Sequence, residues 1–114
     1  MWLMTKHGFY SIVQRAPDLF HVRARERQDL ENLVSRVPLP GAMIVETKDA
    51  DYACRIIAGQ KTVRAIMDLL GATVDYPNFK DKIHSTPDQR HKPYTRVWED
   101  MSAALGAFGR KPHP

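Results

Sequence analysis

Three basic residues alternate with apolar residues in one short segment. The basic ones stand two positions apart, and they are His21, Arg23 and Arg25. The apolar residues between them and before them are Phe20, Val22 and Ala24. Successive side chains of a β-strand point to opposite faces, so the basic residues share one face of a strand predicted over 19–25. That face spans about 13 Å, at ~3.3 Å per residue.

A basic strand face of this kind can hold phosphate through its guanidinium groups while neighbouring rings stack on bases. Arg15 and Arg27 border the segment, and a second basic cluster follows at residues 80–96. The formal net charge is +4, a balance that favours encounter with polyanions. The alternative is a solvated face whose charges discourage aggregation, and the absence of an aromatic RNA-recognition signature favours it.

The segment Asp-Tyr-Pro-Asn-Phe-Lys, residues 75–80, is a second candidate. Tyr76, Asn78 and Lys80 could form an exposed recognition loop, because loops often carry function. In the alternative interpretation the aromatic residues anchor a connection between two helices. Asn78 then caps a helix over 79–85.

The remaining reactive residues do not form a recognisable catalytic or metal-binding motif. Metal sites need three or four ligands at productive spacings, and the five histidines are scattered. Cys54 lies among apolar residues and is predicted to be an inert core thiol. We therefore expect no cofactor, no metal and no catalytic residue.

The spacing of apolar residues predicts the elements that position these side chains. Strands are predicted over 2–5, 9–14, 19–25, 43–47 and 52–57, and helices over 26–36, 60–70, 79–85 and 93–107. This order indicates an α+β fold with an antiparallel sheet of about five strands. An N-terminal hairpin precedes a β-α-β-β-α portion that is ferredoxin-like in part. Two to four helices then pack mainly on one face of the sheet.

Several local signals refine this outline. Gly8 suits the hairpin turn, Gly71 is expected to stop the second long helix, and Pro38-Leu39-Pro40-Gly41 and Thr86-Pro87-Asp88 are breaks. The last helix carries an apolar stripe that favours a packed core face, with a partner's groove as the alternative. Its residues are Tyr94, Val97, Trp98, Met101, Leu105 and Phe108.

The length of 114 residues suits one domain over 1–109, with a frayed tail over 110–114. No stretch approaches the ~18–20 apolar residues of a membrane helix, and the start does not resemble a signal peptide. A single cysteine cannot form an internal disulfide, so the cytoplasm is the expected compartment. The oligomeric state stays open.

Most of the chain up to about Met101 resembles a family of short bacterial and phage proteins. Those proteins begin Met-Trp, as Met1-Trp2 does here. They carry a Val-Arg-Ala-Arg strand like residues 22–25 and share the segment of residues 75–80. The resemblance implies a shared stand-alone domain and supplies no activity or site residue. It does strengthen the strand and the 75–80 segment as candidates.

The leading functional hypothesis is a non-catalytic binding module, of phage or mobile-element origin. It would engage nucleic acid or a nucleoprotein complex through His21, Arg23, Arg25 and Arg27. A second hypothesis is an inhibitor or adaptor that binds a host protein, such as an anti-defence protein of the anti-CRISPR type. A third is a small nuclease-like enzyme using His21, His84 or His91 with Asp75, although no spacing supports that pairing.

Overall fold

The computed structural model describes residues 1–37, 43–85 and 89–106. By its internal contacts the chain divides into two compact units, Met1–Asp75 and Tyr76–Pro114. The prediction of one domain over 1–109 stays a prediction. The tail 110–114 and the predicted breaks within 38–42 and 86–88 lie outside the described residues.

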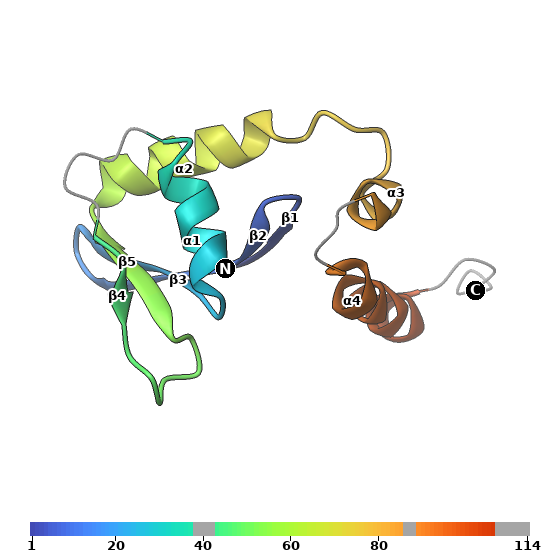
Figure 1. Ribbon diagram of the computed structural model, residues 1–114, viewed down its shortest axis with the longest axis horizontal. Coiled ribbons are helices and arrows are strands. Elements are labelled where there is room, and N and C mark those ends of the chain that lie inside the picture. Colours follow the sequence, from blue (N-terminus) through green and yellow to red (C-terminus); the bar gives the residue numbers. More distant parts are fainter. Residues whose placement is uncertain (38–42, 86–88, 107–114) are drawn as a thin grey trace, which may run out of the picture. The chain divides into compact units, whose positions relative to one another are not determined.

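The first unit holds a five-stranded antiparallel sheet in the order β1-β2-β3-β5-β4 (Figure 1). Its strands are β1 (Trp2–Thr5), β2 (Gly8–Ala16), β3 (Leu19–Ala24), β4 (Val45–Glu46) and β5 (Cys54–Ala58). Its helices are α1 (Arg27–Val34) and α2 (Gln60–Ala72). The predicted α+β class and antiparallel sheet are therefore confirmed.

The strand order follows from how α1 connects β3 to β4. The chain leaves β3, crosses one face of the sheet as α1 and returns as β4, with room for one strand between them. β5 fills that place and pairs antiparallel with both neighbours. This is the ferredoxin-like part of the fold, and the hairpin β1-β2 extends the sheet on the other side of β3.

The hydrophobic core lies between the sheet and the two helices α1 and α2. Val22 and Ala24 of β3 are fully buried there, and Phe20 packs against the same cluster. The core also takes residues of β2, β5, α1 and α2, among them Tyr10, Ile12, Cys54, Ile56, Leu30, Leu33, Val63, Ile66 and Leu70. The predicted core side of β3 is confirmed. We call the opposite side of the sheet, which carries His21 and Arg23, the outer face.

Two carboxylates tie loops of the first unit to the ends of its elements. Asp29 of α1 is buried and accepts a hydrogen bond from the backbone N–H of Phe9, at 3.1 Å. Gly8 is packed directly against that side chain. Asp18, in the β2-β3 turn, accepts from the backbone N–H of Gln60 at 2.7 Å. Asp18 therefore caps α2 from a distant part of the chain.

The second unit contains α3 (Phe79–His84) and α4 (His91–Leu105). The Phe79 and Tyr94 rings stack with centroids 5.7 Å apart, and Tyr94 is buried. Past Tyr94, most of the predicted core stripe is exposed, because the six-residue α3 is much shorter than α4. The exposed members are Val97, Trp98, Met101 and Leu105. Phe108 lies outside the described residues.

Most element boundaries differ from the predicted ones by one or a few residues. α2 runs through Gly71 to Ala72, because Gly71 does not take the positive φ with which a glycine ends a helix, and its carbonyl still accepts a bond from the N–H of Val74. β4 is two residues long instead of five. No helix in the described part of the chain is both long and apolar enough to cross a membrane.

Candidate functional site

The outer face of the sheet carries a row of polar residues that crosses three strands. Ser11 of β2 pairs with Arg23 of β3, which pairs in turn with Arg55 of β5. Paired residues of antiparallel strands point to the same face, so these three side chains lie side by side. Arg23 Nη2 donates to Ser11 Oγ at 2.7 Å, which fixes the first contact of the row.

A pocket of about 430 Å³ opens on this row. It is lined by Arg15, His21, Arg23, Ala50, Asp51, Tyr52 and Arg55. Arg15 reaches it because it follows Val13 by two residues, and Val13 pairs with the outer-face residue His21, so alternation along β2 points Arg15 to the same face. A bulge between Gln14 and Ala16 leaves Arg15 without a paired residue on β3.

Within the described part of the chain, the guanidinium groups that line the pocket lack carboxylate partners. Arg23 bonds the hydroxyl of Ser11, and Arg55 Nη1 donates to the hydroxyl of Thr47 at 2.9 Å. The Nε atoms of both arginines are buried without a hydrogen-bond partner among the described residues. No ion pair of Arg15, Arg23 or Arg55 exists within the same residues. A buried donor without an acceptor is costly, so these groups are suited to an anionic ligand.

Tyr52 holds two of the arginines in place. Its ring centroid lies 4.5 Å from Cζ of Arg23 and 4.4 Å from Cζ of Arg25, and the ring itself is only 8% exposed. Such cation–π contacts restrain the guanidinium groups without neutralising them. Asp51, the one carboxylate of the described residues that lines the pocket, pairs with Arg25 at 3.3 Å, where both side chains are largely exposed.

The environment of the pocket lowers the pKa of the His21 imidazole. Burial lowers its pKa below the ordinary value of 6.5, and the charges of Arg15, Arg55 and Arg23 lower it further. His21 is therefore neutral near pH 7. It lines the pocket as an uncharged hydrogen-bonding group that a bound anion would help to protonate.

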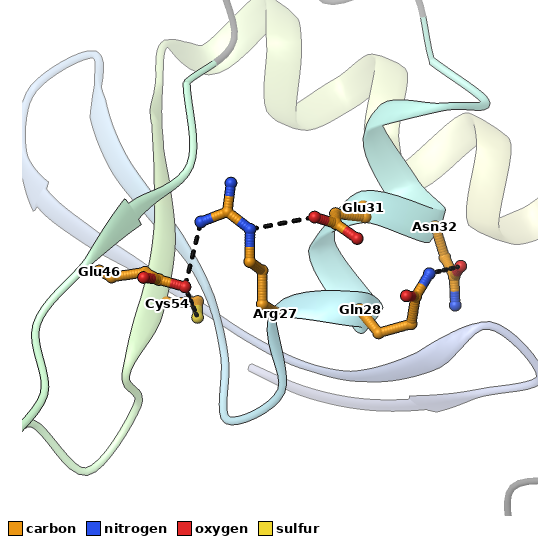
Figure 2. Close-up of polar contacts among 6 residues, drawn as sticks. All are labelled: Arg27, Gln28, Glu31, Asn32, Glu46 and Cys54. Atoms are coloured by element: carbon orange, nitrogen blue, oxygen red, sulfur yellow. Dashed lines mark hydrogen bonds and ion pairs between the residues drawn. The ribbon is translucent and has the colours of Figure 1, made fainter.

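Arg27 is held outside this pocket. Figure 2 shows its guanidinium between two carboxylates, with Nε 3.0 Å from Glu31 Oε1 and Nη1 3.0 Å from Glu46 Oε1. Hydrogen bonds to Glu46 and then Glu31 raise the pKa of Arg27. Its charge is thus already balanced, so His21, Arg23 and Arg25 gather on the outer face without it.

The other three candidate residues, Tyr76, Asn78 and Lys80, belong to the second unit. Asn78 Oδ1 accepts from the Asp81 N–H at 3.1 Å and caps α3, and the Tyr76 ring lies 5.8 Å from that of Phe79. Lys80 Nζ lies 4.6 Å from the centre of the Trp98 ring. These contacts match the interpretation of the segment as a capped, aromatic helix connection.

The described residues contain no group of three or more potential metal ligands. Cys54 is buried, with its sulfur 3.9 Å from Glu46 Oε1 (Figure 2). Burial and the charge of Glu46 raise the pKa of this thiol, so it is a poor nucleophile. The His84 and His91 rings lie 4.6 Å apart in the second unit, and Asp75 of the first bonds Lys6 at 2.7 Å.

Sequence reasoning missed two lining residues, Arg55 and Tyr52. Arg55 stands between the buried residues Cys54 and Ile56, and this alternation could have placed its side chain on the outer face. Its position beside Arg23 depends on the register of β5, which no local pattern reveals. Tyr52 precedes β5, and nothing in the sequence indicates its contact with two arginines.

The chain was compared with protein-family models, with curated proteins and with solved structures, and none of the three comparisons finds a match.

Proposed function

We propose that this protein is a non-catalytic module that binds the phosphate backbone of a nucleic acid through the outer face of its sheet. The observation that carries the proposal is the set of guanidinium groups at the pocket. Arg15, Arg23 and Arg55 converge there from three strands, and no carboxylate of the described residues pairs with them.

Phosphate is the anion that suits this arrangement best. A guanidinium is planar, always charged and able to donate two parallel hydrogen bonds to phosphate oxygens. Arg25 lies beyond the pocket, with its Cζ 6.0 Å from the Phe9 ring centroid, and its ion pair with Asp51 is largely exposed and therefore weak. A ligand with repeated negative charges can contact the pocket and Arg25 at the same time, whereas a single small anion can contact only one of them.

The proposal is tested by titrating the full chain with fluorescently labelled single- and double-stranded DNA and RNA at about 50 mM and about 200 mM salt. Three phosphate contacts to a single strand correspond to a loss of affinity of about 20-fold over this range. Binding with that salt dependence is the expected result. Absence of binding at the lower salt concentration would overturn the proposal.

Binding should also strengthen as the pH falls. A bound phosphate adds negative charge beside His21 and raises its pKa from the lowered value in the free protein. The complex then holds more protons than the free protein between these two pKa values, so affinity rises as pH falls through that window and levels off below it. Phosphodiesters stay ionised throughout.

The measurement is the dissociation constant between about pH 5.5 and about pH 8, the range in which histidine changes charge. His21→Gln should flatten the profile. His7→Gln is the matched control, because burial also lowers the pKa of His7 although it does not line the pocket. An unchanged slope in the His21 variant would show that another group takes up the proton.

A further inference from the structure

The row that carries Arg23 and Arg55 continues from Arg23 through β2 to an exposed tryptophan on β1. Trp2 of β1 pairs with Ser11, which pairs with Arg23. Trp2 is 73% exposed, and its register places it on the outer face. Neighbouring strands are ~4.8 Å apart, so Trp2 lies about 10 Å along the row from Arg23 and about 14 Å from Arg55.

A second row, beside the first, connects the aromatic and cationic ends of the face. Met4 of β1 pairs with Phe9 of β2, and both are half-buried. The guanidinium of Arg25 lies over the Phe9 ring. The outer face is therefore apolar and aromatic at β1 and positively charged at β3 and β5.

We infer that the ligand is a single-stranded nucleic acid that crosses the outer face perpendicular to the strands, with a base stacked on Trp2 and backbone phosphates at Arg23 and Arg55. This inference rests on the proposed function and adds the strandedness of the ligand, its direction and the residue that holds a base. An indole can stack on a base only where that base is not already enclosed in a duplex.

Tyr52 does not serve as the stacking platform, because the arginines at its ring leave it 8% exposed. It is a positioning residue for the phosphate contacts. Trp2 has no such cover, and the row between it and Arg23 holds only Ser11, whose side chain is fully buried. A strand that binds at Arg23 therefore has a neighbouring base within reach of the indole.

The test uses the Trp98→Phe chain, in which Trp2 is the sole tryptophan. Oligothymidylate and oligouridylate of about a dozen residues are titrated while indole fluorescence and the anisotropy of a labelled strand are recorded. We expect both single strands to quench Trp2 with the midpoint seen by anisotropy. An abasic oligodeoxyribose phosphate should bind without quenching, and a duplex of equal length should not quench.

Replacement of Trp2 gives the quantitative test. Trp2→Ala should weaken binding of the single strands about tenfold, in line with the loss of one stacked base. The salt dependence should be unchanged, since the phosphate contacts remain. Trp2→Phe, which keeps a ring, should recover most of the affinity, and the large exposure of Trp2 makes both variants compatible with folding.

The outcomes separate this inference from the proposed function. Salt-dependent binding with an unquenched Trp2 and an unaffected Trp2→Ala variant overturns the inference and leaves the proposed function standing. A duplex that binds as tightly as the single strands without quenching Trp2 also overturns the inference and leaves the proposed function standing. Absence of binding by every nucleic acid at low salt overturns both.

Discussion

Replacing Arg23 and Arg55 together by alanine should weaken binding of nucleic acid on the order of 100-fold at low salt. Hydrogen bonds between a charged pair contribute about 1.5–3 kcal/mol each, and about 1.4 kcal/mol corresponds to a tenfold change in affinity. Because two phosphate contacts are lost, the slope of log K against log salt should also decrease by about 1–2. Fluorescence anisotropy at several salt concentrations measures both quantities.

A matched control separates this site from net charge. Lys61→Ala with Arg64→Ala removes the same two positive charges from exposed positions of α2, on the helix-covered side of the sheet. Its affinity should fall by only a few-fold, as expected for distant screened charges. Equal losses in the two double variants would contradict a site on the outer face.

Arg23 also contacts Ser11 and Tyr52, so its loss could weaken the fold. Arg15→Ala avoids that difficulty, because Arg15 is exposed on its bulge and has no bonded partner among the described residues. It should bind several-fold more weakly with unaltered thermal unfolding. Unchanged affinity in this variant would remove Arg15 from the site.

Gly8→Ala should destabilise the protein by about 3 kcal/mol. A Cβ at this position would lie 2.6 Å from Cβ and 2.7 Å from Oδ1 of Asp29, distances that force the hairpin and α1 apart. Asp29 is buried and bonds Phe9, and its carbonyl accepts from the Tyr10 hydroxyl at 2.7 Å. Separation of the two elements therefore strains several contacts at once.

Chemical denaturation followed by circular dichroism measures the free energy of unfolding of this variant. Gly71→Ala is the matched control, since a Cβ there meets no atom within 4 Å and the residue lies in α2. That substitution should stabilise the protein by about 0.5–1 kcal/mol, because alanine restricts the unfolded chain and favours helix. Similar stabilities for the two variants would contradict the close contact between Gly8 and Asp29.

Local patterns were sufficient to predict the elements of the first unit. The alternation around Val22 specified which side of β3 is buried, since only one face of that strand meets α1 and α2. The same alternation placed His21, Arg23 and Arg25 together. Element boundaries were predicted less well, as at Gly71, because a glycine ends a helix only where it takes a positive φ, and Gly71 does not.

The pocket itself depends on contacts between residues far apart in the chain. Arg55 comes beside Arg23 only through the pairing of β5 with β3, and Arg15 joins them only through the pairing of β2 with β3. Arg27 adjoins the basic strand in sequence, yet Glu31 and Glu46 hold it elsewhere. Sequence proximity therefore grouped Arg27 with the strand residues, and it did not indicate Arg55.

The pairing of β3 with β2 and β5 also determines when the site exists. Its positive charges are dispersed along the unfolded chain and converge only when β2, β3 and β5 have assembled. A ligand that requires this convergence binds the native state and not the denatured ensemble, so its binding energy adds to the stability of the fold. The protein's own melting temperature thus becomes a label-free reporter of which anion it prefers.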